Sequence, residues 1–375
     1  MGAPRGLARI EWDPDPALDA PRTIATSVAL PPHRYRQGEL ARIASRTMPA
    51  LERREGLLER LFERVGVESR HLALPAEEYA ALEGLEARNR AWLEVATELG
   101  LRAVSALLDE SGVAASDVGQ LTTTTVTGIA VPSIDARLMN LLPFHRSLKR
   151  VPLFGLGCLG GAAGLARTAE YLRAYPDELA ILLSVELCSL TLQSDDDSVA
   201  NIISSGLFGD GAAAVLLAGA RHPLARERTR PGPDLLASQS AFFPDTERVM
   251  GWDLADGGFK VVLSASVPDV VREHVPPAVA SFLREQGLER SDIETWVCHP
   301  GGPKVLAALE EGLHLSPDAL AASREVLADV GNLSSASVLY LLDEHRRRRL
   351  PAPGSYGLLL AMGPAFCAEL VLLRW

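Results

Sequence analysis

The sequence predicts an α/β protein built from two similar halves. Segments with helical spacing of apolar residues alternate with short apolar segments along most of the chain, which is the pattern of a sheet covered by helices. The same order of elements occurs before and after a stretch rich in Arg and Pro at 221–234, which suggests an internal duplication without a residue-level repeat. We therefore divide the chain into an N-terminal half, 1–225, and a C-terminal half, 226–375.

In the N-terminal half, apolar residues recur at helical spacing over about 87–110, and a run rich in Thr at 121–127 favours a strand. A short apolar stretch at 153–157 leads into a helix of small residues at 159–175. Two further stretches are wholly apolar, as strands buried on both faces are, and they cover 179–185 and 212–218.

In the C-terminal half, 269–286 reads as a helix that Pro276 and Pro277 should interrupt. A short strand at 295–298 follows. The remaining elements alternate in the same way, with helices at 303–313 and 334–347 and strands at 356–362 and 366–373. The last two strands are joined by a tight turn at Gly363-Pro364.

Composition excludes several classes of protein. The chain has 375 residues and a net charge of −11, whereas general nucleic-acid binders carry a basic balance. Four arginines at 346–349 complement the dipole at a helix end and do not form a basic patch.

No apolar run reaches the roughly 18 residues of a membrane helix, and 1–14 has no apolar core that a secretory signal would need. Four cysteines without a CxxC pair predict neither a disulfide scaffold nor a zinc ribbon. We expect a cytoplasmic enzyme.

Three polar residues occur where a predicted strand gives way to a helix: Cys158, His299 and Asn332. In α/β proteins, ligands bind at the carboxyl ends of strands. A cysteine at a helix N-terminus has a lowered thiol pKa, because the helix dipole favours the thiolate. A nearby His would complete a nucleophilic pair, and an Asn amide would donate to a developing oxyanion.

Each of the three residues also has an ordinary structural explanation. Cys158 can be a small core residue, His299 precedes Pro-Gly-Gly and can belong to a turn, and Asn332 follows Gly331 and can cap a helix. Their shared position at strand-to-helix junctions makes the catalytic interpretation more specific than any one of them alone.

Four motifs resemble the type III polyketide synthases, the chalcone and stilbene synthase-like enzymes, in order and at similar spacing. They are Gly-Leu-Gly-Cys at 155–158, Gly-Leu-Phe-Gly-Asp-Gly-Ala at 206–212, Cys-His-Pro-Gly-Gly-Pro at 298–303 and Gly-Asn-Leu-Ser-Ser at 331–335. The resemblance implies a thiolase-type αβαβα layered fold, a homodimer and a buried Cys-His-Asn site. It also implies acyl-CoA starters and malonyl-CoA extenders, with no metal and no organic cofactor.

The resemblance assigns roles to matching residues. Cys158 would hold the acyl chain as a thioester, His299 would keep Cys158 as a thiolate, and His299 and Asn332 would stabilise the enolate formed when malonyl-CoA loses CO2. Phe208 resembles the aromatic gatekeeper between the CoA tunnel and the cavity, although a core Phe before a Gly-Asp-Gly turn would look the same.

The resemblance also places residues around the substrate. Cys188 occupies the position of a cavity-lining threonine of the plant enzymes, or it is a core cysteine. Val131, before a Pro132 that is expected to be cis, matches the loop that reaches into the partner subunit. The other substrate-binding candidates are the small or turn residues Gly206, Gly363 and Pro364. Arg60, Arg64 and Arg70 are candidates for the CoA phosphates, although interleaved glutamates also fit a solvated helix face.

The bacterial character of 185–192 and the altered loop at 361–365 resemble alkylpyrone and alkylresorcinol synthases, so the main expectation is a long-chain fatty acyl starter. Two alternatives stay open. One is a ketoacyl-synthase III type condensing enzyme of fatty-acid initiation, which also uses Cys, His and Asn. The other is a bacterial tetrahydroxynaphthalene- or phloroglucinol-type synthase that takes malonyl-CoA as starter.

Overall fold

A nine-stranded sheet runs through the molecule. The computed structural model describes residues 19–47, 57–193, 195–196, 198–255 and 257–375. The strand order is β11-β12-β13-β8-β1-β7-β6-β4-β5. Between β1 and β8 only Arg22 and Asp234 are paired, so the sheet divides there into an N-terminal leaf and a C-terminal leaf. The N-terminal leaf contains β1 (Arg22–Ala29), β4 (Val118–Thr125), β5 (Lys149–Phe154), β6 (Leu179–Leu187) and β7 (Asp210–Ala218). The C-terminal leaf contains β8 (Asp234–Phe242), β11 (Ile293–Cys298), β12 (Tyr356–Gly363) and β13 (Cys367–Arg374).

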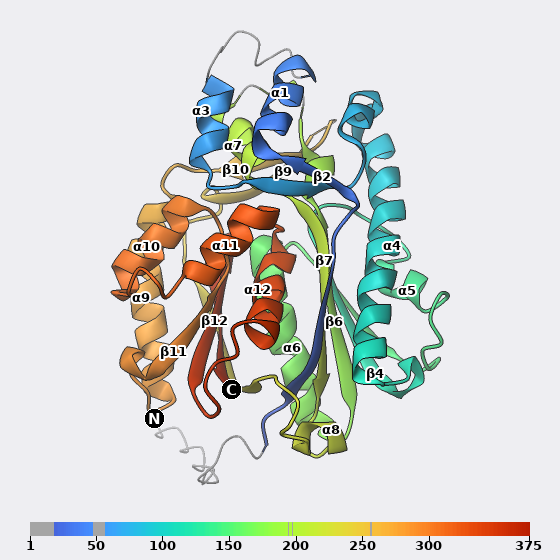
Figure 1. The fold of residues 1–375 in the computed structure, drawn as a ribbon, viewed down its shortest axis with the longest axis vertical. Helices are drawn as coiled ribbons and strands as arrows, with labels where there is room; N and C mark the ends of the chain where they lie inside the picture. Colours follow the sequence, from blue (N-terminus) through green and yellow to red (C-terminus); the bar gives the residue numbers. More distant parts are fainter. Residues whose placement is uncertain (1–18, 48–56, 194, 197, 256) are drawn as a thin grey trace, which may run out of the picture.

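Helices cover both faces of both leaves, and two of them lie between the leaves (Figure 1). The helix α4 (Gly84–Ser111) packs on the outer face of the N-terminal leaf. The helices α6 (Gly160–Ala174) and α12 (Ser335–Arg347) fill the space between the leaves. The helices α9 (Val267–Glu285) and α10 (Pro303–Leu313) cover the outer face of the C-terminal leaf. These layers are the αβαβα arrangement, which confirms the predicted fold class.

The central strands β6 and β7 are buried on both faces because each face meets a different helix layer. In β6, Ile181 and Leu183 belong to the core under α4, whereas Ala180 and Leu182 belong to the core around α6 and α12. All four side chains are completely buried. Since successive side chains of a strand point to opposite faces, a strand between two helix layers cannot show polar alternation. This explains why the sequence reads as an unbroken apolar run.

The remaining elements gather mostly at one end of the layers, the upper end in Figure 1. They are α1 (Gln37–Thr47), α3 (Leu57–Arg64), α7 (Val199–Leu207), the strand pair β2 (His33–Arg36) and β3 (Ser69–Leu72), and the strand pair β9 (Met250–Ala255) and β10 (Gly258–Leu263). Shorter or peripheral helices are α5 (Ile134–Leu138), α8 (Pro223–Arg226) and α11 (Ala321–Val330). Among the described helices, none has the length and apolar character that crossing a membrane requires.

The expectation that Pro276 and Pro277 interrupt a helix was wrong. The helix α9 continues through both prolines. Its buried face, which includes Val271, Val275 and Val279, packs in the core shared with α10. Burial of several such side chains contributes a few kcal/mol, about what a proline costs inside a helix. Tertiary packing therefore compensates for the lost backbone hydrogen bonds.

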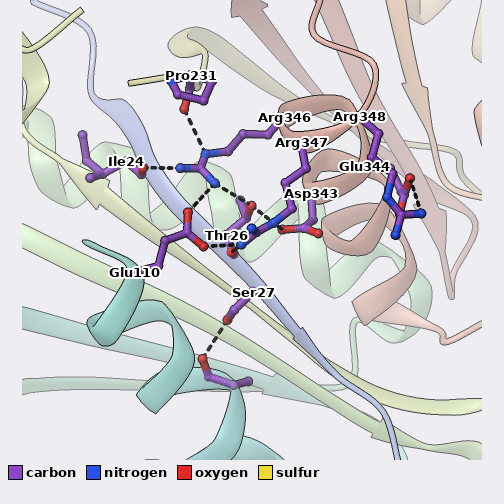
Figure 2. A network of polar contacts seen from close by, with 11 residues as sticks. Ile24, Thr26, Ser27, Glu110, Pro231, Asp343, Glu344, Arg346, Arg347 and Arg348 are labelled. Atoms are coloured by element: carbon purple, nitrogen blue, oxygen red, sulfur yellow. Dashed lines mark hydrogen bonds and ion pairs between the residues drawn. The ribbon is translucent and has the colours of Figure 1, made fainter. Parts of the chain in front are cut away.

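The arginine run at the end of α12 ties the two halves together (Figure 2). The guanidinium of Arg346 is buried and donates to Glu110 of α4 at 2.7 Å, to the carbonyl of Ile24 in β1 at 2.8 Å and to the carbonyl of Pro231 at 2.9 Å. Arg348 instead extends from the protein, with its side chain 74% exposed. Arg346 therefore bonds to specific groups in addition to complementing the helix dipole.

Candidate active site

Cys158 lies in a sharply turned loop between β5 and α6. Two glycines before it have positive φ angles, 89° at Gly155 and 52° at Gly157, a conformation that favours glycine. A Cβ on Gly157 would lie 2.6 Å from Pro364 Cδ, so this loop packs directly on the turn between β12 and β13. The thiol is buried, and Cys158 lies in a 3-10 turn, Gly157–Leu159, that leads into α6.

Two glycines at the start of α6 bring Cys158 close to the start of α12. A Cβ on Gly161 would lie 2.1 Å from the carbonyl oxygen of Ser335, so the two helices touch backbone to backbone. As a result, Cys158 Sγ donates a hydrogen bond to Ser334 Oγ at 3.7 Å. Ser334 has a φ angle of 49°, which is uncommon for a residue with a Cβ and is typical of functional sites.

The side chain of Asn332 is oriented by its neighbours. Its Oδ1 accepts hydrogen bonds from the Ser334 amide at 2.8 Å and from Ser337 Oγ at 3.3 Å. The Nδ2 group is therefore left as the donor, and the Asn332 side chain lowers the pKa of the Cys158 thiol. Asn332 is also buried. The structure thus places an amide donor beside the candidate nucleophile.

His299 lies at the same end of the sheet as Cys158. It follows β11, and its backbone amide donates to Leu360 of β12 at 2.8 Å. The strand β12 ends at Gly363, where a Cβ would lie 2.6 Å from the carbonyl oxygen of Leu156 in the nucleophile loop. Neither imidazole nitrogen of His299 has a hydrogen-bond partner within the described part of the chain. A buried imidazole with both nitrogens unpartnered is available to a substrate.

Burial determines the protonation of this site. It raises the pKa of the Cys158 thiol to about 12, a shift that hydrogen bonds from Ser334 and Asn332 partly offset. It also lowers the pKa of His299 to about 4. Both shifts favour neutral groups in the free enzyme. The sequence predicts a thiolate from the helix dipole alone, and the structure adds the cost of desolvating that charge.

Glu186, at the end of β6, lies beneath the nucleophile and was not identified as a site residue from the sequence. Its carboxylate is completely buried and accepts hydrogen bonds from Thr127 Oγ1 at 2.9 Å, from the Val126 amide at 3.1 Å and from Ser334 Oγ at 3.4 Å. Burial raises the pKa of Glu186 to about 7. A glutamate inside a strand buried on both faces was the available signal.

A cavity of about 100 Å³ lies next to this cluster. It contains two predicted substrate residues, Cys188 and Phe208. Burial raises the pKa of the Cys188 thiol, as do the nearby carboxylates and Cys158. Gly206 borders the cavity through Phe62, whose ring lies 2.9 Å from the place of a Gly206 Cβ. Lining residues that the sequence did not reveal are Tyr79, Trp252 and Val261.

Of the other predicted site residues, Arg70 also lines the cavity, whereas Val131, Arg60 and Arg64 do not belong to its lining. Val131 precedes a cis peptide bond at Pro132, as predicted, and its side chain is 93% exposed. Arg60 and Arg64 are exposed on α3, but Arg70 is 4% exposed and hydrogen bonds to backbone carbonyls. The structure therefore does not bring Arg70 together with the other two arginines.

The chain matches the family models for chalcone and stilbene synthases, with the N-terminal domain at residues 25–221 and the C-terminal domain at 234–375. It is 50% identical to a 1,3,6,8-tetrahydroxynaphthalene synthase of Streptomyces peucetius subsp. caesius, over 94% of this chain and 92% of that protein. It is 32% identical to a 3,5-dihydroxyphenylacetyl-CoA synthase of Streptomyces toyocaensis, over 99% and 94% of the two chains.

Among solved structures, the 1,3,6,8-tetrahydroxynaphthalene synthase of Streptomyces coelicolor A3(2) superposes with a TM-score of 0.87 at 31% identity, covering 94% of this chain and 99% of that one. That protein is a bacterial type III polyketide synthase. Family models and relatives agree over nearly the whole length. This chain therefore belongs to the chalcone and stilbene synthase family and is a type III polyketide synthase, an acyltransferase.

Proposed function

We propose that this enzyme uses malonyl-CoA both as starter and as extender and releases a small polyhydroxylated aromatic compound. The observation that carries the proposal is the likeness, over 94% of this chain, to a synthase named for a small polyhydroxylated aromatic product. The cavity of about 100 Å³ beside the nucleophile has the large side chains of Phe62 and Trp252 in its walls, which agrees with a small starter. The 50% identical relative is named for tetrahydroxynaphthalene, whose ten carbons correspond to five malonyl-derived two-carbon units.

This proposal replaces the long-chain starter as the main interpretation. The alkylpyrone expectation rested on the sequence of 185–192 and on the loop at 361–365. In the structure, Cys188 borders a small cavity whose walls include the large side chains of Phe62 and Trp252. The named relatives support the alternative with malonyl-CoA as starter.

Loading is the first step of the proposed reaction. The Cys158 thiol passes its proton to the unpartnered imidazole of His299, and the sulfur attacks the thioester carbonyl of malonyl-CoA. The bond from that carbonyl carbon to the CoA sulfur breaks, and CoA leaves with the proton. The resulting acyl thioester on Cys158 lies beside the cavity that receives the growing chain. Because the site is buried, the ionic intermediates are stabilised by fixed donors and not by water.

Extension is the second step. An incoming malonyl-CoA loses CO2, and the electron pair of the broken carbon–carbon bond forms a thioester enolate. Asn332 Nδ2 and His299 donate to the enolate oxygen. The enolate carbon then attacks the Cys158 thioester, which forms a new carbon–carbon bond and releases the cysteine sulfur. The product remains on CoA and returns to Cys158 for the next cycle.

Binding roles follow from position. We assign Phe208, which lines the cavity, to the passage for CoA, and Cys188, Gly206, Gly363 and Pro364 to the space around the acyl chain. We assign the CoA phosphates to Arg60 and Arg64, which are exposed on α3. The substrates, all CoA thioesters, correspond to a cytoplasmic reaction without a metal or an organic cofactor.

The second part of the proposal is a homodimer. The strand β5 is the edge of the nine-stranded sheet. Its last residue, Phe154, is 55% exposed, and the neighbouring loop after β4 exposes Ile129 at 44% and Val131 at 93%. Exposed apolar side chains beside an unpaired sheet edge are typical of an interface. We assign this face to contact with a second copy of the chain.

The decisive experiment incubates the purified enzyme with malonyl-CoA alone and identifies products by mass spectrometry. A polyhydroxylated naphthalene or benzene formed without any other starter supports the proposal, and Cys158→Ala should abolish it. As a matched control, Cys367→Ala, at a half-buried thiol, should retain product formation. If malonyl-CoA alone gives no product and alkylpyrones form when a fatty acyl-CoA is added, the proposal is wrong and the starter is a long-chain acyl group. A single β-ketoacyl product on a carrier protein would indicate a ketoacyl-synthase III type enzyme.

A further inference from the structure

Arg70 closes the carboxyl end of the helix that carries Phe208. Its Nη1 donates to the carbonyl oxygen of Ser205 at 2.6 Å and to that of Phe208 at 2.7 Å. Ser205 belongs to the last turn of α7, and Phe208 is the residue that caps it. Carbonyls at the end of a helix have no partner within the helix. One buried guanidinium group therefore satisfies two of them and holds the last turn of α7 in place.

The segment that Arg70 holds is paired with Asn332. The amide of Asn332 donates to the carbonyl of Leu207 at 2.9 Å, and the amide of Gly209 donates back to the carbonyl of Asn332 at 3.0 Å. These two bonds form a parallel bridge between Phe208 and Asn332. A shift of 207–209 would therefore be transmitted to the backbone from which the Asn332 amide projects.

Arg70 also touches the residue before Asn332 directly. Gly331 has a φ angle of 74°, and a Cβ there would lie 3.0 Å from Arg70 Cγ and 2.9 Å from the carbonyl oxygen of Leu207. The aliphatic part of Arg70 is thus packed against Gly331, while its guanidinium lies 5.7 Å from the centre of the Phe62 ring. The side chain braces two chain segments of the site at once.

We propose that Arg70 is a positioning residue that fixes the Asn332 amide and the Phe208 gate relative to Cys158. The inference rests on the proposed function, because it assigns Asn332 to the decarboxylation step. Arg70 lines the cavity, but its guanidinium bonds to the carbonyls of Ser205 and Phe208 and not to the thiol. Its loss should therefore impair the step that needs Asn332 more than it impairs the reactivity of Cys158. A residue that merely stabilises the fold would lower both in proportion to the folded fraction.

The test compares Arg70→Met with Arg173→Met. Arg173 is a matched control, because its Nη2 also donates to two backbone carbonyls, those of Leu235 and Leu236 at 2.9 and 3.0 Å. For each variant we would measure malonyl-CoA decarboxylation, the rate of Cys158 alkylation by iodoacetamide and the melting temperature. We expect Arg70→Met to lower decarboxylation roughly 30-fold or more, a change of about 2 kcal/mol in the barrier. The alkylation rate should change no more than about threefold, because burial, Ser334 and Glu186 all affect the pKa of the Cys158 thiol more than Asn332 does. Arg173→Met should change neither rate more than about twofold.

A double-mutant cycle separates positioning from general damage. If Arg70 acts through Asn332, then Arg70→Met should cost no further decarboxylation in an Asn332→Ala background. Full additivity of the two losses, or an equal fall in decarboxylation and alkylation, would overturn the inference. If Arg70→Met does not fold, Arg70→Lys carries the same comparison, because lysine keeps the charge but cannot reproduce the planar guanidinium. A wild-type enzyme that leaves malonyl-CoA intact would instead refute the proposed function.

Discussion

Ser334 connects the candidate nucleophile to a buried acid. Its hydroxyl lies 3.7 Å from Cys158 Sγ and 3.4 Å from Glu186 Oε1. Ser334 and Glu186 shift the pKa of the Cys158 thiol in opposite directions. The hydrogen bond to Ser334 lowers the pKa of Cys158, whereas the negative charge of Glu186 raises it. Substitutions at the two positions should therefore have opposite effects on thiol reactivity.

Ser334→Ala should slow the alkylation of Cys158 by iodoacetamide at pH 8. The Ser334 hydroxyl accepts from the thiol in this structure and must turn to donate to the thiolate when Cys158 ionises. Hydrogen bonds to charged groups contribute about 1.5–3 kcal/mol. The long S···O distance places the effect near the lower limit, about a tenfold slower rate. Peptide mass spectrometry separates Cys158 from the other three cysteines. Ser323→Ala is the control, because it removes a buried hydroxyl that donates to the Cys298 carbonyl at 2.7 Å and does not contact Cys158. An unchanged rate in Ser334→Ala would contradict the role of this contact.

Glu186→Gln should raise the alkylation rate of Cys158 and change how stability depends on pH. Burial raises the pKa of Glu186 in the folded protein from 4.5 to about 7. Between these values the folded state binds more protons than the unfolded state, so wild-type stability falls as pH rises and is constant above pH 7. This pKa shift corresponds to a fall of roughly 3 kcal/mol at most in the free energy of unfolding between low and high pH.

The measurement is urea unfolding of both proteins at pH 5 and pH 8. Because other groups titrate as well, the useful quantity is the difference between wild type and Glu186→Gln at each pH. The wild type should lose roughly 2–3 kcal/mol more than the variant between the two pH values. Parallel losses in the two proteins would show that Glu186 is already ionised at pH 5.

Trp252→Gly should enlarge the cavity and admit longer starters. The indole lines the cavity from β9, so its removal opens apolar space. Each methylene that enters contributes about 0.8 kcal/mol, or up to about fourfold in kcat/KM. We expect octanoyl-CoA to improve relative to malonyl-CoA. Leu254→Gly is the matched control, since Leu254 belongs to the same strand, is 68% exposed and does not line the cavity. Equal effects of the two substitutions would exclude Trp252 as the wall.

Arg346→Met should destabilise the protein far more than Arg348→Ala. The first change removes the donors to the buried Ile24 carbonyl and to the Pro231 carbonyl, and it leaves Glu110 without this buried guanidinium (Figure 2). Breaking a buried ion pair from one side costs about 3–5 kcal/mol. Arg348 is 74% exposed, and its ion pair among the residues that the structure describes is with Glu344, four residues earlier, at 3.2 Å. Its loss should therefore stay within about 0.5 kcal/mol. Chemical unfolding measures the free energy of unfolding of both variants. Similar losses in the two would show that the contacts of Arg346 between the halves do not stabilise the protein.

The proposed dimer predicts a mass of about twice the 40.2 kDa chain in light scattering. Val131→Asp should shift that mass toward a single chain, because a carboxylate would be buried in the apolar contact. Leu350→Asp places the same charge on another exposed apolar residue, 61% exposed, and should leave the mass unchanged. A fully active wild-type monomer at micromolar concentration would refute the interface.

Local patterns were sufficient for the regular elements. The predicted helix at 303–313 has the same bounds as α10, and the strands at 179–185 and 212–218 fall within β6 and β7. Apolar periodicity carried these predictions because each element buries a continuous face. The short strand pairs β2–β3 and β9–β10 escaped notice, since four to six partly exposed residues produce little periodicity.

The sequence by itself determined the family and the candidate nucleophile. The motif around Cys158 requires residues without a Cβ, and glycines are directly visible in a sequence. Only the tertiary structure decided what surrounds that thiol. Ser334, Glu186 and Arg70 come from three elements that are distant in sequence, and their contacts exist because two sheet leaves close around α6 and α12. Burial is a property of that closed arrangement and not of any residue type. The same enclosure that raises the pKa of Cys158 also bounds the neighbouring cavity, which in the proposed function receives the starter.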